Sequence, residues 1–161
     1  MKVPEFNICN NNGIQKLNLV SSREEVIVIT YDSIVRMMNS RYNMNKLSEE
    51  YAYVLSYGDG RKLLAIYQIS HNYPSSTILR NRELFTFLLL SGAKEFFVVH
   101  NHPFGGSNEH SEGDIRVINK IKEASEIIGI DFVASIVINL DGYSVYENKG
   151  WTDDWIVNNL I

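Results

Sequence analysis

The sequence predicts a single α/β domain, because strand-like runs alternate with segments of helical periodicity along its 161 residues. Residues 51–57 and 63–69 are rich in β-favouring side chains, and the Gly-Asp-Gly string between them predicts a tight hairpin turn. Residues 112–128 repeat apolar side chains at helical spacing. A chain of this length can bury one core, and no linker, internal repeat or low-complexity segment divides it.

The remaining strands follow from short apolar runs bounded by turn residues. We expect extended segments or strands at 3–9, 25–30, 96–99, 132–138 and 143–146. An Asn-rich turn separates the first two of these, and a Leu-Asp-Gly turn separates the last two.

Helical spacing predicts three helices, at 32–45, 84–90 and 112–128. Thr30 or Asp32 would cap the first helix, and Gly129 would end the last. The middle helix is apolar almost all round, so we expect it to be buried against the sheet. The tail, residues 151–161, mixes two tryptophans with polar residues, and would either dock on the body as a short helix or offer an apolar face to a partner.

The composition indicates an ordinary globular protein, with 45% hydrophobic and 21% charged residues. A net charge of −4 gives no general attraction for phosphate backbones, which counts against nonspecific nucleic-acid binding. Cys9 is the single cysteine, so no intrachain disulfide can form and a reducing compartment is expected. No apolar leader or run of about 20 apolar residues occurs, so a cytoplasmic protein is expected.

A cluster of groups that can bind a metal follows the strand at 96–99. His100 and His102 are two residues apart at the end of this strand, and residues at this spacing point to the same face of an extended chain. Pro103 then stops the strand, and Asp114 falls in the first turn of the next helix. Two imidazoles and a carboxylate suit a zinc site with a fourth position open to water.

Other interpretations of these residues remain open at this point. Ser111 and Asp114 also fit a helix cap, in which an acidic side chain is stabilised by the helix dipole. His110 is a spare imidazole that could compete as a ligand, although an exposed position on the loop is expected. His71 lies far from the motif in sequence and is expected to be structural.

The string His100-Asn101-His102-Pro103, followed by a Gly-containing loop and Ser111-x-x-Asp114, resembles the JAMM (JAB/MPN) metalloprotease signature in its RadC-like form. Asn81-Arg82-Glu83 stands where such proteins carry a Pro-Arg-Glu string before a helix, and residues 75–79 resemble the short strand that precedes it. The similarity covers about residues 48–150, so residues 1–47 would brace this core and 151–161 form a tail.

The resemblance implies a JAB/MPN-like, cytidine-deaminase-like fold, with a mixed and largely antiparallel sheet flanked by helices. It implies zinc bound by His100, His102 and Asp114, with Glu83 as general acid/base and Ser111 as a stabiliser of the oxyanion. The reaction would be cleavage of a peptide or isopeptide bond, and a ubiquitin-like conjugate is one possible substrate. Without the resemblance, Glu83 fits equally a solvated acidic residue near a helix N-terminus.

The sequence departs from the family pattern in places that carry no ligand. Eight residues separate His102 from Ser111, one more than usual, and His110 replaces a proline before the serine. Phe104 replaces a small polar residue, and Asn81 replaces the proline of the upstream string. Two other function classes remain: a DNA-repair-associated protein acting on or near nucleic acid, and a metal-binding scaffold without catalysis. Retention of Glu83 together with all three ligands argues against the scaffold.

Overall fold

The hairpin that the Gly-Asp-Gly string predicts is present as strands β3 (Tyr51–Gly58) and β4 (Lys62–His71). They are joined by the one-turn helix η2 (Asp59–Arg61), in which Gly60 adopts a left-handed φ of 67° that favours glycine. The computed structural model describes residues 2–24, 30–71, 81–103 and 106–149. β3 is buried along almost its whole length and lies at the centre of the sheet.

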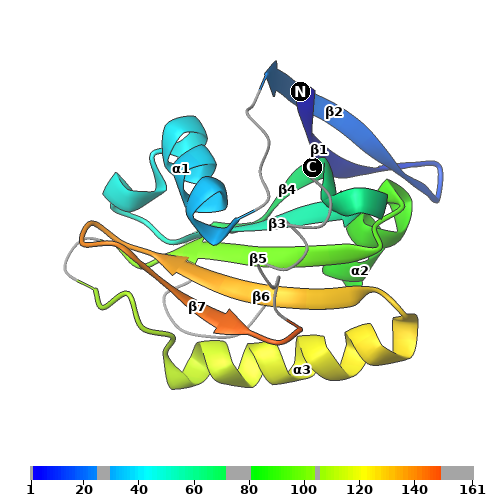
Figure 1. Ribbon diagram of the computed structural model, residues 1–161. Helices are drawn as coiled ribbons and strands as arrows, with labels where there is room; N and C mark the ends of the chain where they lie inside the picture. The colour runs from blue at the N-terminus through cyan, green and yellow to red at the C-terminus, as the bar shows by residue number, and fades with distance from the viewer. Residues whose placement is uncertain (1, 25–29, 72–80, 104–105, 150–161) are drawn as a thin grey trace.

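The sheet has seven strands in the order β2-β1-β4-β3-β5-β6-β7 (Figure 1). The strands not yet named are β1 (Lys2–Asn11), β2 (Ile14–Glu24), β5 (Glu95–Asn101), β6 (Asp131–Ile138) and β7 (Tyr143–Glu147). Among the described strands, β1 runs parallel to β4 and β5 runs parallel to β6, while every other neighbouring pair is antiparallel. The predicted fold class, a mixed and largely antiparallel α/β sheet, is confirmed.

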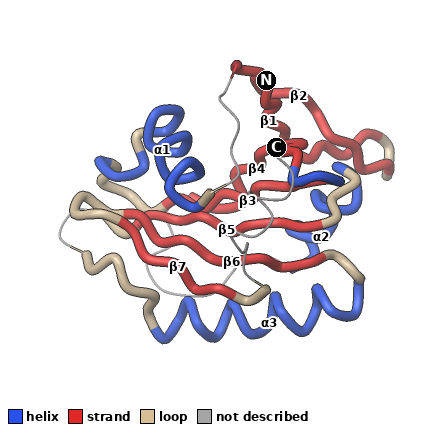
Figure 2. Tube along the Cα trace, viewed as in Figure 1, coloured by secondary structure: helices blue, strands red, loops and turns tan. Residues whose placement is uncertain are grey.

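Helices cover both faces of this sheet (Figures 1 and 2). Helix α1 (Tyr31–Tyr42), followed by the short η1 (Met44–Lys46), packs on one face, and α2 (Asn81–Ser91) and α3 (Glu112–Ile128) pack on the other. Because side chains alternate along a strand, neighbouring residues pack into different hydrophobic cores, one on each face of the sheet. Val99 lies in the core under α1, whereas Val98 lies in the core under α2 and α3.

Helix ends follow the local chemistry that the sequence predicts. Thr30 caps α1, since its hydroxyl accepts from the Ser33 amide while the Ser33 hydroxyl accepts from the Thr30 amide. Gly129 ends α3 with a φ of 78°. Both predicted end signals are confirmed, although α1 stops at Tyr42, a few residues before the expected limit.

Helix α2 is buried against the sheet, as expected, through Leu84, Phe85, Phe87 and Leu88. Its remaining side is open, since Leu89 and Leu90 are exposed. The structure corrects one expectation about the strands. Strand β2 was not expected, and it is an edge strand whose exposed residues lack apolar alternation. The expectations for residues 25–29, for the strand at 75–79 and for the tail at 151–161 fall outside the described residues.

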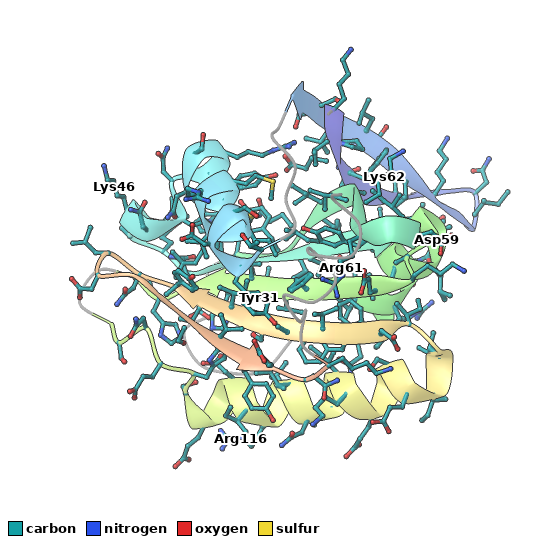
Figure 3. The ribbon with its side chains drawn as sticks, viewed as in Figure 1. Tyr31, Lys46, Asp59, Arg61, Lys62 and Arg116 are labelled. Carbon is teal, nitrogen blue, oxygen red and sulfur yellow. The ribbon has the colours of Figure 1, made fainter. Side chains whose placement is uncertain are left out.

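The two ends of the sheet differ in their chemistry. Figure 3 shows Asp59 and Lys62 of the β3–β4 turn at the opposite end from Lys46 of η1. At the end away from the turn, β3 begins where β5 finishes, because Ala52 pairs with His100 in an antiparallel register.

No helix in the part of the chain that the structure describes is long and apolar enough to cross a membrane.

Candidate metal centre

His100, His102 and Asp114 meet at the end of the sheet where β5 finishes. His100 is the next-to-last residue of β5, His102 follows the strand directly, and Asp114 lies in the first turn of α3. Their potential ligand atoms all lie within 4.8 Å of one another. His102 is held against β6, since its amide donates to the Ile138 carbonyl at 2.9 Å.

The distances within the cluster fit a tetrahedral cation. Nε2 of His100 is 3.4 Å from Oδ1 of Asp114, and Nε2 of His102 is 3.4 Å from Oδ2. Ligands about 2.0–2.2 Å from a tetrahedral zinc lie roughly 3.3–3.6 Å from one another. Nε2 of His100 is also buried without a hydrogen-bond partner among the described residues. A buried ring nitrogen that faces a carboxylate in this way suits a metal between them.

A backbone carbonyl orients the ring of His102. Nδ1 of His102 lies at hydrogen-bonding distance from the Ser107 carbonyl, so Nδ1 carries the proton and Nε2 is left facing Asp114. The hydrogen bond to Asp114 raises the pKa of His102, against the effect of burial. This pattern, a backbone acceptor behind a ring whose other nitrogen faces the cluster, is typical of metal-binding histidines.

Asp114 is held by the residue that caps its own helix. Both the amide and the hydroxyl of Ser111 donate to Oδ2 of Asp114, each at 2.7 Å. Burial by itself raises the pKa of the Asp114 carboxyl, but its interactions with His100, His102 and Ser111 outweigh burial and lower it. Asp114 is therefore an anion in the folded protein, which is the form that binds a metal.

Ser111 thus lies beside the cluster, as the sequence suggested, and the helix-cap interpretation is confirmed. Its hydroxyl accepts from the Asp114 amide at 3.1 Å while it donates to the Asp114 carboxylate. The cap and the candidate metal ligand are the same pair of residues, so the two interpretations are compatible. A role for Ser111 at an oxyanion stays a prediction.

Glu50, which the sequence did not single out, is the fourth ionisable group at the cluster. It is half-buried and immediately precedes β3, whose Ala52 lies opposite His100. Residues 50 and 52 share one face of an extended chain, so Glu50 lies on the same face as His100. Burial raises the pKa of Glu50, while the nearby His100 and His102 lower it. The effect of burial is the larger, so the pKa of Glu50 lies above its ordinary value.

Glu83 lies elsewhere on the same face of the sheet. It lies in the first turn of α2, accepts a hydrogen bond from the Tyr67 hydroxyl of β4, and lines a cavity of about 330 Å³ with the β1–β2 hairpin. Tyr67 is opposite Val54, and Val54 is opposite Val98, so the Tyr67 backbone lies two strands, or about 10 Å, away from β5. Among the described residues, no contact joins Glu83 to the three ligands, and its role as general acid/base stays a prediction.

His110 is not an exposed loop residue, because its ring lies against strands β6 and β7 at the edge of the sheet. Its Nε2 is 3.1 Å from the Ser135 hydroxyl of β6, and its Nδ1 is 3.4 Å from the Ser144 hydroxyl of β7. Its ring centroid is 5.9 Å from that of His100. Burial lowers the pKa of His110 to about 4, so the ring is neutral at pH 7 and fixes the loop next to Ser111.

Comparison with known proteins agrees with the resemblance that the sequence motif indicated. A family model for the RadC-like JAB domain matches residues 28–151, well over half of the chain, and its range begins before residue 48 and includes α1. A UPF0758 protein of Listeria monocytogenes is 25% identical over 162 residues, which cover 92% of this chain and 71% of that protein.

Two further relatives are also UPF0758 proteins. The one from Caldanaerobacter subterraneus subsp. tengcongensis is 28% identical over 140 residues, which cover 86% of this chain and 58% of that protein. The one from Desulforamulus reducens is 32% identical over 108 residues, which cover 67% of this chain and 47% of that protein. This chain therefore spans between about half and 71% of the length of these curated relatives.

Proposed function

Because the chain belongs to the family of RadC-like JAB domain proteins, we propose that it is a zinc-dependent hydrolase that cleaves a peptide or isopeptide bond. The observation that carries the proposal is the convergence of His100, His102 and Asp114, with both imidazole-to-carboxylate distances at 3.4 Å. Three protein ligands of this kind leave a coordination position for water, which is the arrangement of catalytic zinc sites.

Zinc bound by these three residues would act as a Lewis acid on the substrate carbonyl and lower the pKa of bound water to about 7. The protein's own part is to hold the ligands rigidly. His102 is oriented by the Ser107 carbonyl, and Asp114 is oriented by Ser111. Such supporting hydrogen bonds fix both the direction of the ligands and their charge.

Glu50 is the carboxylate that the geometry supports best as general acid/base. It lies on the face of His100, and the charges of His100, His102 and Asp114 all act on it. A carboxylate in this position can accept a proton from the attacking water and return it to the departing amine. Glu83, which the sequence motif suggested for this role, is the alternative to be tested against it.

The substrate is proposed from the reaction class alone. A peptide or a protein conjugate, including one joined to a ubiquitin-like modifier through an isopeptide bond, carries the amide carbonyl and amine leaving group that this site would act on. Cleavage of a lysine-linked isopeptide and cleavage of an α-peptide bond require the same proton transfers, so the two substrate types have to be compared directly.

The first experiment is elemental analysis of the purified protein. We expect about one zinc per chain in the wild type and loss of zinc in His100→Ala and Asp114→Asn, because three-ligand sites do not survive removal of one ligand. His71→Ala is the matched control, since His71 is an exposed histidine that pairs with Glu49. Absence of zinc after reconstitution, or equal zinc in all variants, would contradict the proposed site.

The second experiment is a cleavage assay with the zinc-loaded protein. The substrates are fluorogenic peptide amides and lysine-linked isopeptides of the same flanking sequence. We expect turnover that is lost in His102→Ala and restored in the wild type when zinc is returned after chelation. Full turnover in the chelated protein would exclude the metal-dependent mechanism.

A further inference from the structure

The residue between the two histidines has a role of its own in the fold. Asn101 is the last residue of β5 and is completely buried, with 0% of its surface exposed. Its side chain points away from the face of His100 and His102, because neighbouring residues of an extended chain alternate. A buried amide has to satisfy both its donor and its acceptor, and Asn101 does so on the chain that leads into β3.

The two hydrogen bonds of Asn101 enclose Glu50. Its Oδ1 accepts from the Tyr51 amide at 2.8 Å, and its Nδ2 donates to the Glu49 carbonyl at 2.9 Å. The Glu49 carbonyl belongs to the peptide group before Glu50, and the Tyr51 amide belongs to the peptide group after it. Both backbone torsions of Glu50 are thereby fixed by one side chain.

His71 contacts the side chains of the two residues that flank Glu50. Nε2 of His71 is 2.6 Å from Oε2 of Glu49, and the His71 ring stacks on the Tyr51 ring with centroids 4.1 Å apart. Tyr51 lies on the other face of the sheet, and Glu49 contacts the His71 ring that stacks on Tyr51. These contacts on both sides of Glu50 leave its side chain directed to the metal cluster.

We propose that Asn101 is a positioning residue that holds Glu50 at a fixed place relative to His100 and His102, and so sets the efficiency of proton transfer. The expected effect on turnover rests on the proposed function, but the expected effect on the place of Glu50 does not. An asparagine is suited to the position because it combines a donor and an acceptor on a short side chain. Serine keeps a donor and an acceptor on one oxygen but has a shorter reach, and alanine has neither.

The test compares Asn101→Ser and Asn101→Ala with Glu50→Gln in the zinc-loaded protein, using the fluorogenic peptide amide that the wild type cleaves best. We expect Asn101→Ala to keep its zinc and its KM within about twofold and to lower kcat by about 10- to 100-fold, since displacement of a catalytic group by 1 Å can cost this much. Asn101→Ser should fall between alanine and the wild type. In the Glu50→Gln background, Asn101→Ala should cause no further loss.

Asn139 supplies the matched control. It is also a buried asparagine at the end of a neighbouring strand, and it bonds backbone groups of a turn and of the loop, but its described hydrogen bonds do not involve residues 49–51. Any loss caused by Asn139→Ala should therefore add to the loss caused by Glu50→Gln. If the Asn101 losses also add to Glu50→Gln, Asn101 has only a general structural role and the inference is wrong.

Crystal structures of the zinc-loaded wild type and Asn101→Ser give a readout that does not depend on turnover. We expect the Glu50 carboxylate to move by about 1 Å or more, or to become disordered, while the three ligands stay in place. A Glu50 that keeps its place would overturn the inference. If the wild type cleaves no substrate, the proposed function fails and the structures alone decide whether Asn101 positions Glu50.

Discussion

Ser111 and Asp114 hold each other through three hydrogen bonds. The amide and hydroxyl of Ser111 both donate to Oδ2 of Asp114 at 2.7 Å, and the Asp114 amide donates to the Ser111 hydroxyl oxygen at 3.1 Å. The capping box that starts α3 is therefore also the support of a candidate metal ligand. Helix stability and metal affinity are coupled at this point, because one side chain serves both.

Ser111→Ala should lower both quantities. Loss of the cap should cost about 1 kcal/mol of unfolding free energy, and loss of the support for Asp114 should weaken zinc binding about 10- to 100-fold. Urea unfolding and zinc titration against a competing chelator measure the two effects separately. Thr30→Ala is the control, since Thr30 and Ser33 form the same capping box on α1, under the other face of the sheet. Thr30→Ala should lose stability and keep its zinc affinity. A zinc affinity of Ser111→Ala equal to that of the wild type would contradict the coupling of helix stability and metal binding.

Glu50→Gln and Glu83→Gln distinguish the two candidates for general acid/base. Glutamine keeps the size of the side chain but cannot take up a proton. We expect Glu50→Gln to retain zinc and to lose about 100- to 10,000-fold in kcat, and Glu83→Gln to stay near the wild type, because its described partner is the Tyr67 hydroxyl. Single-turnover rates with measured zinc content decide the question. The reverse result would restore the assignment made from the sequence motif.

The contrast between these two glutamates shows what the sequence could predict. His100, His102 and Asp114 were predicted because their grouping depends on short-range rules, the two-residue period of a strand and the capping of a helix. Glu50 depends on the pairing of β3 with β5, which brings together residues about 50 positions apart, as in the bond between Tyr51 and Asn101. No local pattern encodes that register, and the one usable signal was an acidic residue, Glu50, immediately before the predicted strand at 51–57.

The fold also divides into features that local sequence rules predict and features that depend on the tertiary arrangement. The β3–β4 hairpin and the end signals of α1 and α3 were predicted, because each is fixed by turn or capping residues. Strand β2 was missed because it lies at the edge of the sheet, where Leu19 and Val20 are both exposed and no alternation is required. The exposure of Leu89 and Leu90 in α2 was also missed, since composition alone does not show which side of a helix meets the sheet.

Gly106→Ala should disturb the metal centre through crowding. A Cβ at this position would lie 3.1 Å from the Cβ of His102 and 3.1 Å from the Pro103 carbonyl oxygen. Relief of this contact should shift His102, weaken zinc binding and cost about 1–3 kcal/mol of stability. Gly58→Ala is the control, because its Cβ would crowd the flexible Leu64 side chain, also at 3.1 Å, at the opposite end of the sheet. Zinc affinity that falls equally in both variants would show a general rather than a local effect.

His110 should make the stability of the protein depend on pH below neutrality. Burial lowers the pKa of His110 to about 4 in the folded state, whereas a histidine in the unfolded chain has a pKa of about 6.5. Between these values the unfolded chain binds a proton that the folded protein does not, so stability is lost as the pH falls from 6.5 to 4. One such proton contributes at most about 1.4 kcal/mol per pH unit.

His110→Gln should therefore reduce the slope of unfolding free energy against pH in this window. Urea unfolding at several pH values between 4 and 7, with wild type and variant in parallel, measures the difference in slope. Ser135→Ala is the control, because it removes the hydroxyl 3.1 Å from Nε2 of His110 and keeps the titrating ring. The control should lose stability at every pH and keep the slope of the wild type. An unchanged slope in His110→Gln would mean that other groups of the site cause the acid sensitivity.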